Sequence, residues 1–198
     1  MSKAIVLEIW NRLRAFAPIP FDHLELIYSA HAKLVALRKG DQIVSEKLQG
    51  AMLGYVHTGL CSIFTKRLAT DFNIRNFVGP GDVADLEPLG LSQRHVGLHA
   101  IVDSKIVLFE KEILEVLCLR HKEWETIVRR YNQQSLKSFS ERVAMLSSDS
   151  ATERIKFFFS NHPELVQIVP DKFIANHLNI APETLSRIRK KSRSADAF

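Results

Sequence analysis

Residues 171–191, DKFIANHLNIAPETLSRIRKK, predict a helix-turn-helix, and the rest of the chain is interpreted outward from this stretch. Apolar residues recur at helical spacing on both sides of a short break: Ile174, Ala175 and Leu178 on one face of the first helix, and Leu185 and Ile188 on one face of the second. The small side chain of Ala175 lets two helices cross closely. We therefore expect the two helices to pack through these faces.

The connection between the two helices has the composition of a tight corner. Asn179 is, after glycine, the residue best able to adopt a left-handed backbone, and Ile180 is placed to fill the corner. Pro182 suits the first turn of a helix, where a missing N–H costs nothing. Glu183 follows at the positive end of the helix dipole. The sequence thus predicts that the second helix starts at Pro182.

The second helix carries short polar and basic side chains on its outward face. We expect the following residues to contact DNA: Glu183, Thr184, Ser186, Arg187, Arg189, Lys190 and Lys191. Polar groups and an arginine near a helix start suit base edges in the major groove, and a basic tail suits phosphates. The alternative is a pair of helices that never touches nucleic acid, with a solvated basic tail. Core spacing, corner chemistry and outward charge agree, and together they favour DNA.

Composition and charge allow this function without requiring it. The 198 residues are 46% hydrophobic, enough for one or two cores, and the net charge is +5 with a pI of about 9.3. Residues 151–198 hold eight Lys/Arg and five Asp/Glu, whereas residues 1–150 hold nineteen and seventeen. The positive surplus per residue is therefore concentrated beside the predicted helix-turn-helix.

Two distant cysteines, Cys61 and Cys118, suggest neither a disulfide framework nor a zinc ribbon, so we expect a reducing, cytoplasmic location. The N-terminal stretch 4–16 is amphipathic rather than a signal peptide, and no apolar run approaches the length of a membrane span. A second short helix is expected over 23–31, after Pro18 and Pro20.

Residues 33–110 change to short apolar runs with turn signals between them. The runs are 34–37, 43–44, 52–56, 61–64, 72–77 and 106–109. The turn signals are at 40–41, 50, 58–59, 79–82 and 103–104. This spacing predicts an all-β barrel or double-sheet roll rather than a parallel α/β sheet.

Helical periodicity returns over 113–146. Apolar residues recur at three-and-four spacing: Trp124, Val128, Tyr131, Leu136, Phe139, Val143 and Leu146. A helix this long exceeds what a small roll can cover, so we expect its stripe to meet the same stripe of a second subunit. The alternative is a helix packed wholly on its own domain. Residues 147–150 are expected to form a hinge, 151–160 a helix, and 165–169 at most one short strand.

The predicted fold class is therefore α+β. N-terminal helices and a jelly-roll-like β-roll form a sensor domain over 1–112, a dimerisation helix spans 113–146, and a helix-turn-helix domain spans 147–198. This order resembles the Crp/Fnr superfamily of bacterial transcription regulators. The stretches that carry the resemblance are Lys-Gly-Asp at 39–41, Gly-Tyr-Val-His-Thr-Gly-Leu at 54–60, Gly-Pro-Gly-Asp-Val at 79–83 and Pro-Glu-Thr-Leu-Ser-Arg at 182–187.

The resemblance implies a homodimer that binds near-palindromic double-stranded DNA, with RNA polymerase and a small-molecule effector as further partners. The family's DNA-contacting Glu, Thr and Arg fall on Glu183, Thr184 and Arg187. Pro182 stands where the family often has an arginine, and seven residues after Lys191 leave little room for the family's β wing. We therefore expect an altered sequence preference and a loose tail at 192–198.

The family's cyclic nucleotide cassette aligns with Asp85, Leu86, Glu87, Arg94 and His95. A bound cyclic nucleotide needs a cation for its phosphate and an acceptor for its sugar hydroxyl. Arg94 aligns with the phosphate-binding arginine, but Leu86 stands in place of the sugar-binding Glu, and His95 replaces a small hydroxyl residue. The altered cassette disfavours a cyclic nucleotide and leaves a different effector or none. Two distant cysteines also do not supply the thiolates of an iron–sulfur sensor.

Two other functions are compatible with parts of this sequence. A β-roll can host a metalloenzyme, but His57, His95 and His99 lack the His-x-His and Glu pattern of such sites, so we expect structural or surface histidines and neither catalytic nor metal-binding residues. The runner-up is a ligand-sensing or protein-interaction module with a vestigial helix-turn-helix.

Overall fold

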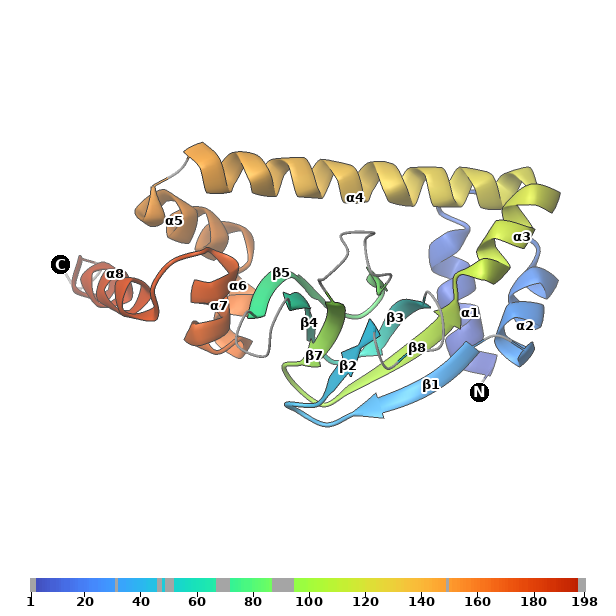
Figure 1. The fold of residues 1–198 in the computed structure, drawn as a ribbon, viewed down its shortest axis with the longest axis horizontal. Helices are drawn as coiled ribbons and strands as arrows, with labels where there is room; N and C mark the ends of the chain where they lie inside the picture. Colours follow the sequence, from blue (N-terminus) through green and yellow to red (C-terminus); the bar gives the residue numbers. More distant parts are fainter. Residues whose placement is uncertain are drawn as a thin grey trace. The chain divides into compact units, whose positions relative to one another are not determined.

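The computed structural model describes residues 3–30, 32–45, 48, 52–66, 72–86, 95–148 and 150–195. The chain divides into two compact units, Met1–Gln134 and Ser135–Phe198. Figure 1 shows two antiparallel sheets with helices before and after them, which confirms the predicted α+β class.

Two helices open the first unit, α1 (Lys3–Leu13) and α2 (Phe21–Ala30). The buried face of α1 consists of Ile5, Val6 and Ile9, as its apolar spacing predicts. Trp10 fixes the connection to α2, because its indole Nε1 donates a hydrogen bond to the carbonyl of Ile19 at 2.9 Å. The Trp10 ring also packs edge to face against the Phe21 ring, with 5.6 Å between the ring centroids.

Eight strands among the described residues form two four-stranded antiparallel sheets. They are β1 (Ala32–Leu37), β2 (Gln42–Val44), β3 (Met52–Thr58), β4 (Cys61–Lys66), β5 (Phe72–Val78), β6 (Val83–Asp85), β7 (His95–Ala100) and β8 (Ser104–Glu110). The sheet orders are β1-β8-β3-β6 and β2-β7-β4-β5. The predicted double-sheet roll is therefore confirmed, with β6 and β7 as strands that the sequence analysis missed.

Two apolar cores follow from the alternation of side chains along the strands. Ile106 and Leu108 of β8 point between the sheets, where they meet Leu98 of β7 and Leu86. Val107 points to the opposite face, where it packs against the helices in one cluster with Ile9. The roll thus has an apolar interior, and helices cover the outer face of one of its sheets.

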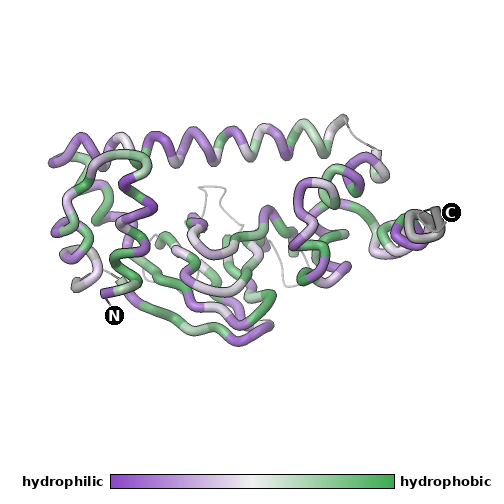
Figure 2. The backbone as a smooth tube through the Cα atoms, turned by 180° about the vertical axis from the view of Figure 1, so that it is seen from behind, coloured by the Kyte–Doolittle hydropathy of each residue, from purple (hydrophilic) through white to green (hydrophobic). Residues whose placement is uncertain are grey.

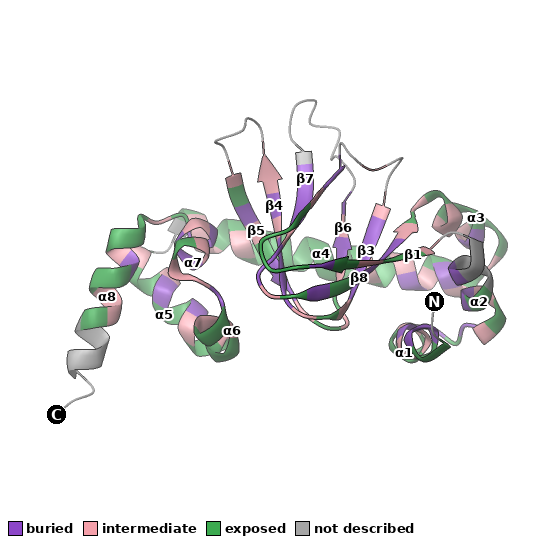
Figure 3. Cartoon of the chain, turned by 90° about the horizontal axis from the view of Figure 1, so that it is seen from below, coloured by how far each residue is buried: buried purple, intermediate pink, exposed green. Residues whose placement is uncertain are grey.

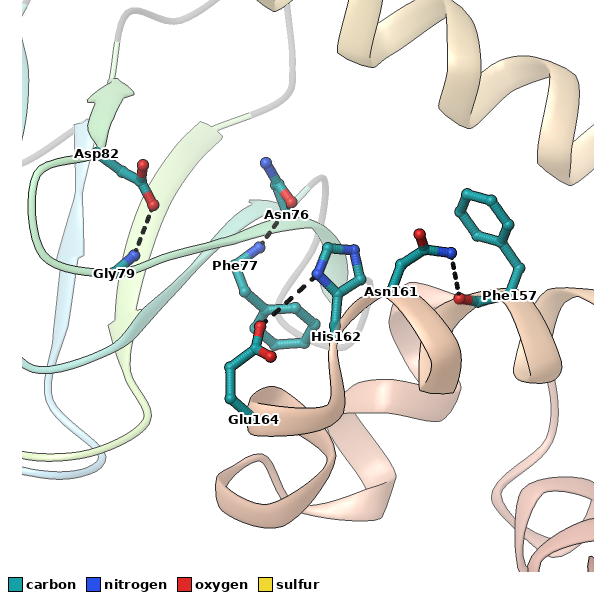
Figure 4. A network of polar contacts seen from close by, with 8 residues as sticks. All are labelled: Asn76, Phe77, Gly79, Asp82, Phe157, Asn161, His162 and Glu164. Atoms are coloured by element: carbon teal, nitrogen blue, oxygen red, sulfur yellow. Dashed lines mark hydrogen bonds and ion pairs between the residues drawn. The ribbon is translucent and has the colours of Figure 1, made fainter.

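Glycine-containing turns connect strands of one sheet to strands of the other, β3 to β4 at Gly59 and β5 to β6 at 79–82. Gly59 has a φ of +95°, and a Cβ at this position would lie 2.2 Å from the Ser104 hydroxyl oxygen, so the turn accepts no side chain. In the turn before β6, the Asp82 carboxylate accepts a hydrogen bond from the Gly79 backbone N–H at 2.9 Å (Figure 4). The predicted turn signals at 58–59 and 79–82 thus coincide with turns of the structure.

The predicted helix over 113–146 is two helices, α3 (Glu112–Arg120) and α4 (Lys122–Ser148). The break is at His121, whose extended backbone has φ −140° and ψ 114°. Leu117 and Trp124, on either side of it, are both buried in the helix-covered core. The Trp124 indole Nε1 also donates to His23 Nδ1 at 3.2 Å. These contacts require a change of direction that periodicity does not reveal.

Four helices follow in the second unit: α5 (Ala151–Asn161), α6 (Pro163–Ile168), α7 (Asp171–His177) and α8 (Pro182–Ala195). The strand expected at 165–169 is wrong, since most of this run belongs to α6. Pro163 occupies the first turn of that helix, where its missing N–H costs nothing. At the end of α5, Asn161 Nδ2 donates to the Phe157 carbonyl at 2.8 Å, and His162 lies 3.9 Å from Glu164 (Figure 4).

Replacing Ser150 by alanine is expected to destabilise the second unit by about 1 kcal/mol, because α5 begins with a capping box. Ser150 N–H donates to Glu153 Oε2 at 2.7 Å, and Glu153 N–H donates to Ser150 Oγ at 3.3 Å. Hydrogen bonds from the Ser150 side chain, and then from its backbone, hold the pKa of Glu153 below its usual value. Urea unfolding followed by circular dichroism measures the loss.

The same pKa shift sets the sign of the pH dependence. Because the pKa of Glu153 is lowered in the folded state, its contribution is present above the ordinary carboxyl pKa and disappears as the pH falls through the lowered value. The difference between native protein and Ser150→Ala should therefore shrink in acid. Ser160→Ala, on the exposed side of the same helix, is the control. Equal losses for both variants would contradict the capping role.

Candidate nucleic-acid interface

The helix-turn-helix of α7 and α8 is built as its spacing predicts. Its core residues Ile174, Ala175, Leu178 and Leu185 are fully buried, and Ile188 is half-buried. Asn179 has a φ of +50°, the left-handed backbone expected at the corner. The N–H of Ile180 then bonds to the carbonyl of Ala175 at 3.0 Å, which closes the end of α7. This packing fixes the direction of α8 relative to α7.

The outward face of α8 presents most of the residues expected to contact DNA. Glu183, Ser186, Arg187 and Lys190 are exposed, and Thr184 is half-buried. Figure 3 shows most of the described part of α8 in the colours of exposed and intermediate residues. The side chain of Lys191 lies outside the described residues, although its backbone belongs to α8. One surface of the helix therefore combines a carboxylate, hydroxyls and cations.

Arg189 does not join that surface, which corrects the prediction that it points outward. Its guanidinium forms a close ion pair with Asp171 at the start of α7 and donates to the carbonyl of Val166 in α6 at 3.0 Å. It also lies over the ring of Phe159 in α5, 5.0 Å from the centroid. The side chain thus ties α8 to three other helices. Charge alone could not show this, because the polar partners are 18 and 23 residues away.

The apolar stripe of α4 is exposed in its second half. Leu136, Phe139 and Val143 are 65%, 54% and 49% exposed, and Leu146 is half-buried. Hydrophilic and hydrophobic residues alternate along the helix in Figure 2. In its first half, the helix is held by Arg130, which donates to the Phe16 carbonyl at 2.8 Å. The exposed residues repeat at heptad spacing, which is typical of a two-helix interface.

The predicted ligand cassette is only partly within the described residues. Asp85 is held by Lys111, whose Nζ lies 3.2 Å from its carboxylate, and Leu86 is fully buried in the core between the sheets. Glu87 and Arg94 lie outside the described residues, as does the side chain of His95, whose backbone begins β7. Leu86 therefore serves as a core residue, and Asp85 serves as an ion-pair partner.

Two polar side chains of β3, Tyr55 and His57, have a partner on α1. Glu8 of α1 accepts a hydrogen bond from the Tyr55 hydroxyl at 2.6 Å and lies 2.9 Å from His57 Nδ1, which joins α1 to β3. Burial, and next the hydrogen bond to Glu8, raise the pKa of Tyr55 well above its usual value. Burial likewise raises the pKa of the Cys61 and Cys118 thiols, which favours their protonated form.

Within the described part of the chain, no three His, Cys, Asp or Glu side chains gather as metal ligands would. Among the described helices, none combines the length and apolar character needed to cross a bilayer.

Solved structures with a similar arrangement of elements include proteins described as regulators. FixK2 from Bradyrhizobium japonicum matches with a TM-score of 0.70 at 23% identity, over 83% of this chain and 86% of that chain. A Eubacterium rectale protein described as a regulator of the Crp/Fnr family matches with a TM-score of 0.69 at 14% identity, over 93% and 88%. CLP, a c-di-GMP-responsive global regulator from Xanthomonas campestris, matches with a TM-score of 0.67 at 14% identity, over 89% and 93%.

The chain therefore has the fold of the Crp/Fnr-type regulators: a cyclic nucleotide-binding-like roll followed by a helical C-terminal domain. No family sequence model matches it, and no curated protein sequence matches it significantly. At these identities, the similarity establishes the fold, which agrees with the resemblance inferred from the sequence.

Proposed function

We propose that this protein is a homodimeric transcription regulator that binds near-palindromic DNA through α8 and is controlled by its β-roll. The observation that carries the proposal is the helix-turn-helix itself, in which Glu183, Ser186 and Arg187 stand exposed on a helix whose other face is fully buried at Leu185. A rigid helix with carboxylate, hydroxyl and guanidinium groups on one side suits the major groove. The function is one of binding rather than catalysis.

The exposed stripe of α4 supports dimerisation. Pairing of Leu136, Phe139 and Val143 with the same residues of a second copy would remove these side chains from water. Two recognition helices would then meet successive major grooves about 34 Å apart, one turn of B-form DNA. This geometry requires a near-palindromic operator, because a twofold dimer reads two equivalent half-sites. RNA polymerase is a further partner under this proposal.

The roll is proposed as a sensor whose effector is not a classical cyclic nucleotide. Leu86 occupies the apolar interior where the cassette would need a sugar-binding Glu, and Asp85 is engaged by Lys111. A ligand bound by the roll would act by favouring one of two arrangements of the dimer, since an effector shifts an equilibrium only through unequal affinity for its states.

Replacing Arg187 by alanine tests the recognition helix. We expect the affinity for a site selected from random DNA to fall by about 1–3 kcal/mol, with relaxed preference at one base position of each half-site. The expected cause is loss of the base contacts that a guanidinium makes in the major groove. Fluorescence anisotropy with the selected site and with single-base variants of it measures both quantities.

Lys156→Ala is the matched control, because it removes one exposed positive charge from α5 rather than from α8. This variant should weaken binding to all DNA sequences alike, if at all, and keep the base preference. An Arg187→Ala protein with unchanged affinity and unchanged preference would refute the assignment of α8 as the reading helix.

A further inference from the structure

A contact between α4 and the end of α7 links the proposed dimer helix to the helix-turn-helix. The guanidinium nitrogen Nη1 of Arg142 lies 2.9 Å from Nδ1 and 3.4 Å from Nε2 of His177. Both residues belong to the second compact unit, although 35 positions separate them in sequence. His177 is the last residue of α7, directly before the corner that leads to α8. The contact therefore acts at the joint between the two helices of the motif.

The His177 ring is held in a fixed environment. Its residue is 9% exposed, and its ring centroid lies 5.5 Å from that of Phe158 in α5, itself a buried core residue. Phe158 also contacts His162, at 5.2 Å between centroids. Since aromatic packing fixes the ring, Arg142 meets an imidazole with little freedom to turn away.

Hydrogen-bonding chemistry sets the protonation state that this contact needs. A guanidinium has five N–H donors and no acceptor, so the imidazole must supply the acceptor. The guanidinium nitrogen lies within reach of both ring nitrogens, and which of them accepts depends on the tautomer, so the neutral ring can serve in either form. Protonation of His177 would turn the acceptor into a donor and place two cations in contact. The link is therefore compatible with neutral His177 alone.

The charged groups around this link have other described partners. On α7 itself, Asp171 pairs with Arg189. On α5, the guanidinium nitrogen Nη2 of Arg154 donates a hydrogen bond to the carbonyl of Asn179 at 3.5 Å. His162, beyond Phe158, lies 3.9 Å from Glu164. From α4, Arg142 is the cation that faces the imidazole.

Arg142 also stands beside the proposed dimer interface. It precedes Val143 of the exposed stripe, and in the heptad that places Leu136 and Val143 at the same position it occupies the flanking position where coiled coils place charged residues. One end of this side chain thus adjoins the surface that would meet the second subunit, and the other end holds α7.

We propose that Arg142 is a positioning residue: through neutral His177 it sets the orientation of the helix-turn-helix on α4, and protonation of His177 releases it. This inference rests on the proposed function and adds a mode of regulation to it. Release would let the two recognition helices depart from the spacing of the half-sites, so acid should weaken specific binding. Without the link, protonation should strengthen binding, because added positive charge favours a polyanion. The sign of the pH effect therefore separates the two cases.

The experiment measures affinity for a selected DNA site from about pH 8 to about pH 5.5, a range that spans the titration of an ordinary histidine. The native homodimer should lose about tenfold in affinity over this range, as expected when a hydrogen bond to a charged group is lost. In His177→Gln, the amide oxygen still accepts from Arg142 but does not titrate, so affinity should stay level or rise in acid. In Arg142→Gln, affinity at high pH should already be reduced, and the acid loss should be absent.

His162→Gln is the matched control, because His162 touches the same Phe158 ring and has no arginine partner among its described contacts. This variant should keep the native acid loss. The proposal is overturned if native affinity is level or rises in acid, or if His177→Gln loses affinity as the native protein does.

A measurement without DNA distinguishes failure of this inference from failure of the proposed function. Nitrogen-15 NMR of the histidine rings should show a neutral His177 ring, with one protonated and one unprotonated nitrogen, at high pH. Amide hydrogen exchange of α7 should quicken in acid in the native protein but not in His177→Gln. If these hold and no specific DNA site is found, the proposed function fails while the link stands. A His177 ring that carries protons on both nitrogens at high pH, or amide exchange of α7 that does not change with pH, would overturn the link itself.

Discussion

Replacing Phe139 by aspartate is expected to convert the proposed homodimer into a folded monomer and to lower affinity for an operator with two half-sites by about a hundredfold or more, the range set by loss of linked binding. Phe139 is 54% exposed in the protomer, so a carboxylate there costs the isolated fold little. In a dimer paired through α4, the substitution would place two negative charges, one from each subunit, in an interface from which water is excluded. Analytical ultracentrifugation gives the oligomeric state, and anisotropy gives the affinity.

The neighbouring Ser138→Asp variant is the matched control, because Ser138 is also exposed on α4 but lies outside the heptad stripe. It adds the same charge to the same helix and should remain dimeric. Far-UV circular dichroism should be native for both variants. A Phe139→Asp protein that still sediments as a dimer would show that α4 does not pair through this stripe.

Replacing Arg189 by alanine is expected to destabilise the second unit by about 1–3 kcal/mol, since it leaves the Val166 carbonyl and the Asp171 carboxylate without their guanidinium. Arg189→Lys should recover only part of the loss, because an ammonium lacks the planar fork that serves two acceptors at once. Urea unfolding measures the stability, and hydrogen exchange of α7 and α8 locates the loss.

The alternative role for Arg189, a phosphate contact, predicts a different result. Arg189→Ala would then leave the unfolding free energy unchanged and reduce the salt dependence of DNA binding by about one counterion. Arg187→Ala serves as the comparison, because this exposed arginine two positions earlier on the same helix should leave stability unchanged. Equal unfolding curves for native protein and Arg189→Ala would reject the structural role.

The sequence predicts the fold well where local conformational preference and tertiary packing favour the same type of residue at a position. Asn179 and Pro182 suit the corner on conformational grounds alone, and the structure places them as expected. Strand β7 was missed because Gly97 resembles a turn residue. It is needed instead for close packing, since a Cβ there would lie 2.6 Å from the Phe64 ring. The break at His121 was missed for a similar reason, because distant contacts of Leu117 and Trp124 determine it.

The residues of the candidate site were likewise predicted where local periodicity decides their exposure, and missed where distant contacts decide it. Exposure of Glu183, Ser186 and Arg187 follows from helical periodicity around Leu185, which sequence spacing reveals. The inward role of Arg189 depends on partners that approach only when α6 and α7 fold against α8, so no spacing rule identifies it. Arg142 and His177 were missed for the same reason. The nearest sequence signal was a lone arginine beside an apolar stripe, which is also typical of a solvated helix.

The joint at Ser147 and Ser150 has a mechanical consequence. Ser147 Oγ bonds to the carbonyls of Val143 and Ala144, at 2.7 and 3.2 Å, so the last turn of α4 is closed from within. Ser150 and Glu153 close the first turn of α5 in the same self-contained way. A pivot between the two helices would break none of these bonds. These bonds therefore do not set the orientation of α5 relative to α4, and we expect side-chain contacts between helices, such as that of Arg142 with His177, to contribute to it.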